Sequence, residues 1–209
     1  MKFPNYKYNN IISYSKDYIE EHYKVFLNTN LNNLKKICEL IEKNYKTKNS
    51  KLIVCGNGGS AALANHFACD HQKILYSTKK YKPCIISLCA NNALITAISN
   101  DIKYENVFSE QILEYCNKDS SDILLTISSS GKSKNIIKAI STAKKIGIKT
   151  ISLTGFDGGK AKKISDMNIH VNSNNYGIIE SIHHSIMNII AQYLKNKVIL
   201  KSKIKKTIF

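Results

Sequence analysis

The sequence predicts an α/β protein of three layers, with a central parallel sheet of about five strands between two layers of helices. Short, nearly continuous apolar runs alternate with segments whose apolar residues recur at helical spacing. Such runs are typical of strands covered on both faces. A length of 209 residues suits one domain and is short for two. We expect one domain, with N-terminal helices at 1–47, the α/β core at 51–196 and a basic tail at 197–209.

Each element follows from its apolar pattern. Two helices are predicted ahead of the first strand, over 10–28 and from Leu31 through Ile41, and we expect them to form a helical hairpin. Such a hairpin would cap the sheet or supply an oligomer interface. Strands are then expected at 51–55, 84–89, 122–127, 149–153 and 167–171. The helices between and after them are expected at 60–75, 91–99, 105–116, 133–146 and 178–196.

The charge of the chain favours small anionic ligands. The formal net charge is +16, and every basic side chain is a lysine. Lysine lacks the planar fork with which arginine reads phosphate or guanine, so we expect no dedicated nucleic-acid partner. No apolar run approaches the ~20 residues that span a bilayer, and the first 15 residues do not resemble a signal peptide. We therefore expect a cytoplasmic protein without a membrane partner, although the lysine-rich tail leaves an acidic partner open.

Two turns rich in glycine and serine each follow an apolar strand and precede a helix. The first reads GNGGS at 56–60, and the second reads SSSGKS at 128–133. Such a turn aims backbone N–H groups, hydroxyls and a helix N-terminus at one point, which suits a phosphate. Both turns lie where parallel sheets bind ligands, at the carboxyl ends of strands. We expect a phosphorylated ligand between them, with Lys132 as a counter-charge; the alternative is that the serines only cap the helix.

Two nucleotide motifs are incomplete in these turns. Gly56, Gly58 and Ala61 match the dinucleotide fingerprint, but the acidic residue it needs about 20 positions later is missing from the second strand. The segment GKS at 131–133 resembles the end of a P-loop, but Thr126 stands where that motif requires glycine. We expect no nucleotide cofactor.

Four segments in order resemble the sugar isomerase (SIS) family, and within it the phosphoheptose isomerases. They are CGNGGSAALANHF at 55–67, SNDIKYENVF at 99–108, TISSSGKS at 126–133 and LTGFDGGK at 153–160. The resemblance covers roughly residues 10–196 and implies the flavodoxin-like SIS fold. It also implies a homotetramer with active sites between subunits and a phosphorylated open-chain sugar as ligand. The residues it implies for substrate and phosphate binding are Asn57, Gly58, Gly59, Ser60, Asn100, Asp101, Ser128, Ser129, Ser130 and Ser133.

The resemblance also implies a reaction, the conversion of sedoheptulose 7-phosphate to D-glycero-D-manno-heptose 7-phosphate for lipopolysaccharide or capsule. This chemistry needs a base beside the carbonyl carbon and an acid or metal that stabilises the enediolate. Family members place a His-x-x-x-Glu pair on the first core helix, and a Gln and a His on the last helix. The catalytic residues that this match implies are His66, Asp70 and Glu180, together with His184 as a substitute for the family's histidine, whose position is Asn188. Where one Zn²⁺ ion is bound per site, the ligands would be His66, Asp70, Glu180, and His184 or Asn188.

Departures from the family pattern leave the function open. Asp70 is a methylene shorter than the family's Glu, and Asn188 cannot titrate. An arginine of the family falls at Ile74. His184 lies four residues from both Glu180 and Asn188, on the same helical face, and would supply the missing imidazole unless it is only a packed histidine. The alternatives are a non-catalytic phosphosugar-binding protein, like the related branch that binds the bacterial replication initiator, and an isomerase of another phosphosugar.

Overall fold

The computed structural model describes residues 3–74 and 78–207. Its centre is a sheet of five strands in the order β2-β1-β3-β4-β5, and every neighbouring pair is parallel. The strands are β1 (Leu52–Gly56), β2 (Ile85–Ser87), β3 (Ile123–Ser128), β4 (Lys149–Thr154) and β5 (Met167–His170). The five predicted strands are confirmed, with β2 shorter than expected because it is an edge strand paired on one side.

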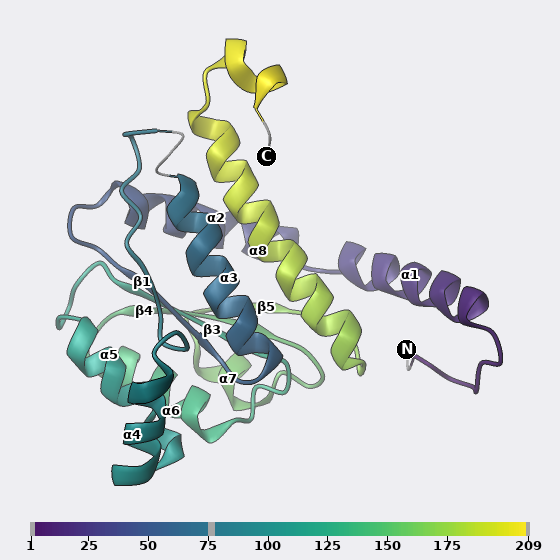
Figure 1. Cartoon of the computed structure of the whole chain (residues 1–209), viewed down its shortest axis with the longest axis horizontal. Helices are drawn as coiled ribbons and strands as arrows, with labels where there is room; N and C mark the ends of the chain where they lie inside the picture. The colour runs from purple at the N-terminus through teal and green to yellow at the C-terminus, as the bar shows by residue number, and fades with distance from the viewer. Residues whose placement is uncertain (1–2, 75–77, 208–209) are drawn as a thin grey trace.

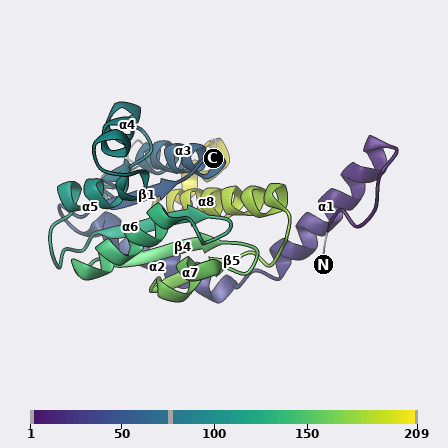
Figure 2. The ribbon, with the colours of Figure 1, turned by 90° about the horizontal axis from the view of Figure 1, so that it is seen from below.

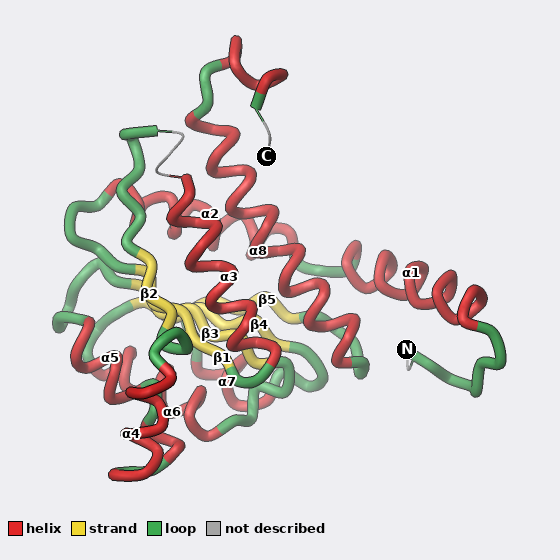
Figure 3. The backbone as a smooth tube through the Cα atoms, viewed as in Figure 1, coloured by secondary structure: helices red, strands yellow, loops and turns green. Residues whose placement is uncertain are grey.

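Helices cover both faces of this sheet. They are α1 (Ile11–Leu27), α2 (Leu31–Lys46), α3 (Gly59–Lys73), α4 (Asn92–Asp101), α5 (Ser109–Tyr115), α6 (Lys134–Lys145), α7 (Gly159–Ile164) and α8 (Tyr176–Val198), with 3₁₀ helices η2 (Tyr104–Asn106) and η3 (Lys201–Lys206). In Figures 1 and 3, α2, α3 and α8 lie on one face, and α5, α6 and α7 lie on the other. The predicted three-layer α/β arrangement is therefore confirmed.

The central strands have apolar sequences because helices cover both faces of the sheet. Every residue of β1 and β3 is buried. Helix α6 shows the matching amphipathic pattern, because Ile136 and Ile140 are fully buried while its lysines lie on the other side. Burial on both faces is what turns a strand sequence into a continuous apolar run.

The helices of the structure differ from the predicted ones in three places. The helix expected at 105–116 is divided into η2 and α5, because Val107 and Phe108 turn inward and are buried between them. Helix α7 was not predicted, since its sequence GKAKKI is short and rich in lysine. The basic tail contains η3. Leu75, the last residue of the helix expected at 60–75, lies outside the described residues, as do positions 1–2 and 208–209 of the expected N-terminal helices and tail.

The predicted N-terminal hairpin is wrong in its geometry. Both helices form, but α1 leads away from the body of the molecule instead of folding back along α2 (Figures 1 and 2). Helix α2 buries Ile37 and Ile41 against α8 and the β5 side of the sheet. Helix α1 contacts α8 instead, where the Tyr18 side chain lies against Gly177. No helix among residues 3–74 and 78–207 is long and apolar enough to cross a bilayer.

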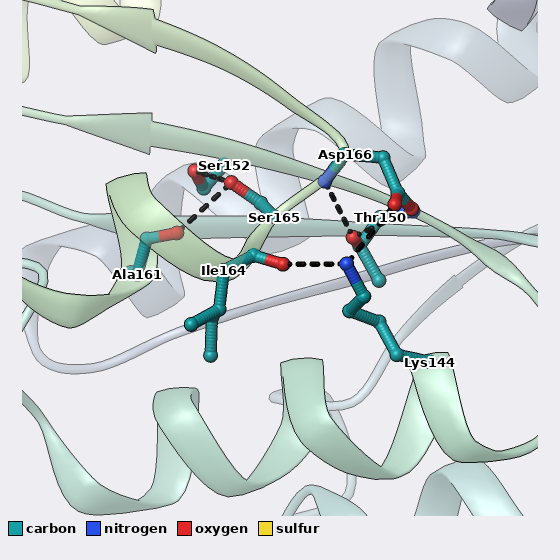
Figure 4. A network of polar contacts seen from close by, with 7 residues as sticks. All are labelled: Lys144, Thr150, Ser152, Ala161, Ile164, Ser165 and Asp166. Carbon is teal, nitrogen blue, oxygen red and sulfur yellow. Dashed lines mark hydrogen bonds and ion pairs between the residues drawn. The ribbon is translucent and has the colours of Figure 1, made fainter.

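A polar network joins α6, β4, α7 and the turn before β5 (Figure 4). The Asp166 carboxylate accepts hydrogen bonds from the N–H and hydroxyl of Thr150, at 2.8 and 2.9 Å, and an ion pair from Lys144 at 3.2 Å. Burial alone would raise the pKa of Asp166, but the Thr150 and Lys144 contacts lower it. Ser165 adds hydrogen bonds to Ala161 and Ser152. The network fixes α7, which follows the loop that supports the serine-rich turn.

Candidate active site

The two polar turns meet at one edge of the sheet. Strands β1 and β3 are neighbours, so the turn after each leaves the sheet at the same edge. The side-chain amides of Asn57 and Asn135 then bond to each other, with Nδ2 of each donating to Oδ1 of the other at 2.9 and 2.8 Å. The Tyr104 hydroxyl also donates to Asn57 Oδ1, at 2.9 Å. The glycine-rich turn is therefore tied directly to the first turn of α6.

The glycine-rich turn opens α3. Gly58 is the N-cap residue, with φ of +55°, a conformation that favours glycine. The Ser60 N–H donates to the Asn57 carbonyl at 3.0 Å, and the Ser60 side chain is buried. The backbone N–H groups at the start of α3 point toward the edge where the two turns meet, and they favour an anion there.

The four serines of the second turn divide into two pairs. Ser128 Oγ accepts the Gly131 N–H at 3.2 Å, and Ser130 Oγ accepts the Lys132 N–H at 3.3 Å. Ser129 Oγ is buried and has no hydrogen-bond partner in the described part of the chain. Ser133 is the N-cap residue of α6, yet its side chain forms no capping bond with any described residue. Two hydroxyls thus shape the turn, and two form no hydrogen bond within the described part of the chain.

The loop after β4 braces the serine-rich turn. The Gly155 N–H donates to the Ser129 carbonyl at 2.7 Å, and the Ala161 N–H donates to the Gly131 carbonyl at 2.9 Å. Gly131 has a φ of +62°, and a Cβ there would lie 2.0 Å from the Gly158 carbonyl oxygen. Only glycine fits at this close approach. The turn is therefore held in its shape before any ligand binds.

Lys132 is not a free counter-charge in this structure. Its Nζ lies 2.7 Å from Asp157 Oδ2, and both side chains are exposed. The hydrogen bond from Lys132 lowers the pKa of Asp157. The positive potential at the turns therefore comes first from the N-termini of α3 and α6.

A cavity of about 390 Å³ opens beside the meeting point of the turns. Its lining residues are Asn57, Lys103, Tyr104, Glu105, Ser133, Lys134 and Asn135. The sequence reasoning missed Tyr104 and Asn135, although Tyr104 lies in the segment SNDIKYENVF and Asn135 follows the serine-rich turn by two residues.

Asn100 and Asp101 are exposed at the end of α4, where Asn100 Nδ2 donates to Asp101 Oδ1 at 2.9 Å. Neither belongs to this lining, and their binding role stays a prediction.

The predicted catalytic pair lies further along α3. His66 Nε2 is 2.9 Å from Asp70 Oδ2, and Lys73 Nζ is 3.3 Å from Asp70 Oδ1. The spacings of four and three residues place all three side chains on one helical face. The shorter side chain of Asp70 therefore still reaches the His66 imidazole. The Asp70 carboxylate lies between this imidazole and the Lys73 ammonium group.

Helix α8 runs beside α3 and brings the remaining residues (Figure 1). The His184 ring packs edge-on against His66, with centroids 4.7 Å apart, and His184 Nε2 is buried without a hydrogen-bond partner among described residues. Glu180 lies one turn earlier, and a Cβ on Gly59 would come within 3.1 Å of its Oε2. Glycine at 59 thus leaves room for a carboxylate at the N-terminus of α3.

Asn188 faces Asp70 one turn beyond His184. Both line a second cavity of about 220 Å³, together with Lys73, Ile74 and other side chains of α3 and α8. Asn57 and Ser133 of the predicted anion site therefore border one cavity, and Asp70 of the predicted catalytic pair borders another.

The donor set does not form a zinc site as it stands. Imidazoles and carboxylates are ligands that zinc takes. However, within the described ranges no group of three His, Cys, Asp or Glu side chains converges on one point. His66 and Asp70 bond to each other, while Glu180 lies beside the start of α3.

Two further histidines are buried and belong to the packing. His183 Nε2 lies 3.2 Å from the Thr154 carbonyl oxygen, and burial lowers the pKa of His183 to about 4. His71 Nδ1 bonds to the Tyr45 hydroxyl, and burial lowers the pKa of His71 to about 3. Both are neutral at physiological pH, and neither faces the predicted site.

Comparison with known proteins agrees with this geometry. A family model described as SIS domain matches residues 14–155. The probable phosphoheptose isomerase of Thermoplasma acidophilum is 39% identical over 184 residues, which are 88% of this chain and 98% of the relative. The phosphoheptose isomerase of Helicobacter pylori strain P12 is 41% identical over 145 residues, 69% of this chain and 74% of the relative.

A solved structure shows the same likeness. The phosphoheptose isomerase from Francisella tularensis superposes with a TM-score of 0.77 at 28% identity, over 89% of this chain and 96% of that one. The fold is that of the SIS-domain class of proteins. Within that class, the chain belongs to the phosphoheptose isomerase family.

Proposed function

We propose that the protein is an aldose–ketose isomerase that converts sedoheptulose 7-phosphate to D-glycero-D-manno-heptose 7-phosphate. The cytoplasm is the compartment we propose for it, and heptose supply for lipopolysaccharide or capsule is the proposed use of its product. The observation that carries the proposal is the His66–Asp70 pair on α3, the helix that begins at the glycine-rich turn. The His66 ring of this pair packs against His184 of α8. Membership of the phosphoheptose isomerase family supports the choice of substrate.

The phosphate end is assigned to the two turns. The N-termini of α3 and α6 supply backbone N–H groups and favourable dipoles. The hydroxyls of Ser129 and Ser133 supply donors that make no hydrogen bond with the described residues. Because the loop around Gly155 and Ala161 braces the serine-rich turn, these donors need little rearrangement on binding.

The proton transfer is assigned to the histidines. The reaction removes a proton from C1 of the ketose, forms an enediolate and returns a proton to C2. We assign the base to His66, whose imidazole is oriented by Asp70. We assign to His184, whose buried Nε2 has no hydrogen-bond partner among the described residues, the donation of a hydrogen bond to the substrate oxygen that becomes negative. Glu180 is the remaining acidic group close to the start of α3.

A homotetramer with active sites between subunits is part of the proposal. Supporting it, Asn57 and Ser133 of the anion site border one cavity of the chain, and Asp70 of the catalytic pair borders another. A second chain that brings its own pair toward this anion site would unite the two. Each active site would then contain elements of two subunits.

Zinc is kept as a proposal for measurement, with no reaction step assigned to it. The residues to which it is assigned are His66, Asp70, Glu180, and His184 or Asn188. Metal analysis of protein purified without chelators is the direct test. About one zinc per chain would support binding, whereas metal-free protein that gains neither zinc nor activity on addition would contradict it.

The alternative is a phosphosugar-binding protein without catalysis. It is favoured by Asn188, which cannot exchange a proton and stands at the family's histidine position. An isomerase of a pentose or hexose phosphate is a further alternative with the same chemistry.

One experiment separates these functions. The protein is incubated with sedoheptulose 7-phosphate, with and without zinc, and aldose formation is followed by NMR. Parallel samples contain pentose and hexose phosphates. Aldoheptose formation supports the proposal, and conversion of another sugar alone reassigns the substrate. Binding without conversion in every sample supports the non-catalytic alternative.

A further inference from the structure

The charge of the chain is distributed unevenly, because residues 181–209 contain no acidic side chain. All 15 Asp and Glu residues lie at or before Glu180. Six lysines follow close together, at positions 195, 197, 201, 203, 205 and 206. Without acids between them, these lysines form a concentrated positive charge that attracts a surface of opposite sign.

Four of the six lysines lie on η3, which extends beyond the end of α8 and away from the sheet (Figure 1). All four are exposed, and none forms an ion pair with a residue among 3–74 and 78–207. Lys197 differs, because it is paired with Glu42 of α2 and so contributes to the fold. The η3 lysines are Lys201, Lys203, Lys205 and Lys206.

Apolar side chains stand between these lysines without joining the core. Leu200 is 63% exposed, and Ile204 is partly exposed. In the described part of the chain, neither belongs to the hydrophobic core or packs against it. A spacing of four residues would place both on one side of an α-helical turn, as in segments that lie on a membrane surface.

We propose that residues 198–207 bind the surface of a membrane that contains anionic lipids. The η3 lysines contact the headgroup phosphates, while Leu200 and Ile204 enter the boundary between headgroups and acyl chains. Such a contact is peripheral and needs no helix that crosses the bilayer. It replaces the expectation of no membrane partner, which was drawn from the lack of a spanning run and of a signal peptide.

The composition of the segment favours lipid over nucleic acid. A nucleic acid also attracts lysines, but proteins that bind single strands add aromatic rings on which the bases stack, and arginine is the side chain best suited to phosphate and base edges. Residues 198–207 contain neither aromatic residues nor arginine. Exposed Leu and Ile gain from leaving water for the acyl boundary, whereas a phosphate backbone offers them no apolar contact.

The expected strength can be bounded from the charges. A lysine close to an anionic leaflet raises binding about fivefold, so the four η3 lysines together account for about 10²- to 10³-fold. Salt should reverse most of this attraction, because the screening length falls from ~10 Å at about 0.1 M to ~3 Å at about 1 M.

The first test measures co-sedimentation of the full chain with vesicles. One vesicle contains phosphatidylcholine alone, and the other contains equal parts of phosphatidylcholine and phosphatidylglycerol. We expect the wild type to bind the anionic vesicle at low salt, to leave it at high salt and to ignore the neutral one. Absence of binding to the anionic vesicle would overturn the proposal. Isomerase activity is not measured, so either result leaves the proposed function untouched.

Two variants with equal net charge locate the contact. In the η3 variant, Gln replaces Lys201, Lys203, Lys205 and Lys206. In the control variant, Gln replaces four exposed lysines outside the segment, namely Lys118, Lys145, Lys149 and Lys163. We expect the η3 variant to bind the anionic vesicle about 10²- to 10³-fold more weakly, and the control to stay close to wild type. Equal losses would show that only total charge matters, and they would overturn the assignment to η3.

A second variant separates a membrane from a nucleic acid while keeping every lysine. Leu200→Ser with Ile204→Ser should weaken vesicle binding about tenfold and leave binding to polyuridylic acid unchanged. Unchanged vesicle binding would remove the role of the apolar side chains. Tighter binding of wild type to polyuridylic acid than to the anionic vesicle would reassign the segment to nucleic acid.

Discussion

His66 Nε2 lies 2.9 Å from Asp70 Oδ2, one turn further along α3. A carboxylate in that position fixes the orientation of the imidazole and stabilises the positive charge that forms when the ring takes a proton. The second Asp70 oxygen is 3.3 Å from Lys73 Nζ, so the carboxylate is itself held in place. The pair thus has the geometry of a positioned base, although its carboxylate is one methylene shorter than that of the family.

Replacing His66 by Ala should abolish turnover and leave phosphosugar binding nearly intact. Loss of a positioned base lowers kcat by about 10²- to 10⁴-fold. Binding survives because the anion site lies on the turns after β1 and β3. NMR measures turnover, and calorimetry measures binding. Cys69→Ala, exposed on the same helix, is the control. Turnover at the wild-type rate would remove the role assigned to His66.

Ser129→Ala should weaken phosphosugar binding about tenfold and change kcat little, because one hydrogen bond to a charged group is lost. The buried Ser129 Oγ has no other partner among residues 3–74 and 78–207, so its loss should not destabilise the fold. Titration calorimetry measures the affinity, and Ser202→Ala in the exposed tail is the control. Equal affinities in wild type and Ser129→Ala would mean that this hydroxyl does not contact the phosphate.

Gly131→Ala and Gly58→Ala form a matched pair for stability. Both glycines have positive φ, and such backbone conformations cost an alanine on the order of 1–3 kcal/mol. At Gly58 no atom of the described residues lies within 4 Å of the added Cβ, whereas at Gly131 the Gly158 carbonyl oxygen lies 2.0 Å away. We expect Gly131→Ala to lose about 1–3 kcal/mol more in urea unfolding. Equal losses would show that the loop after β4 does not brace the serine-rich turn.

Glu42 should make stability fall at acid pH. Burial alone would raise its pKa, but hydrogen bonds from Lys197, Lys46 and Tyr81 outweigh burial and lower the pKa from 4.5 to about 2. An acid with a lowered folded-state pKa stabilises the protein above its unfolded pKa and loses that contribution as the pH falls. The loss should be on the order of 3 kcal/mol between about pH 4.5 and pH 2.

The measurement for Glu42 compares two proteins. Urea unfolding of wild type and Glu42→Gln is followed across this pH range at equal protein concentration. Wild type should be more stable near neutral pH, and the difference should shrink toward pH 2. A difference independent of pH would contradict the role given to the ionised carboxylate.

Local sequence was sufficient for most of the sheet and for the two turns. Strands such as Ile123–Ser128 are buried on both faces, so their apolar character is visible without a partner. Local sequence was insufficient to predict α7. Its sequence GKAKKI has one buried residue, Ala161, which is too little for a helical apolar pattern to be recognised among the lysines. It also missed the break at Val107 and Phe108, because helical spacing does not show which side of a segment the core will take.

The site shows the same division. The His66–Asp70 contact is local to one helix, and the spacing of four residues predicts it. Asn135 and Tyr104 contact Asn57 from positions 78 and 47 residues away, so only the folded sheet brings them together. Lys132 was expected to serve as a counter-charge to the phosphate. Its contact with Asp157 could not be predicted, because it depends on how the loop after β4 returns to the serine-rich turn.

By itself, the sequence determined a parallel α/β sheet with two polar turns and a histidine–carboxylate pair, because these depend on short-range periodicity and spacing. Tertiary structure decided that the turns join through Asn57 and Asn135, that Asp70 borders a separate cavity, and that α1 leads away from the body. These arrangements depend on contacts between segments that are far apart in the sequence and on which surfaces stay exposed once the helices cover the sheet. A pattern within one short segment contains no information about either.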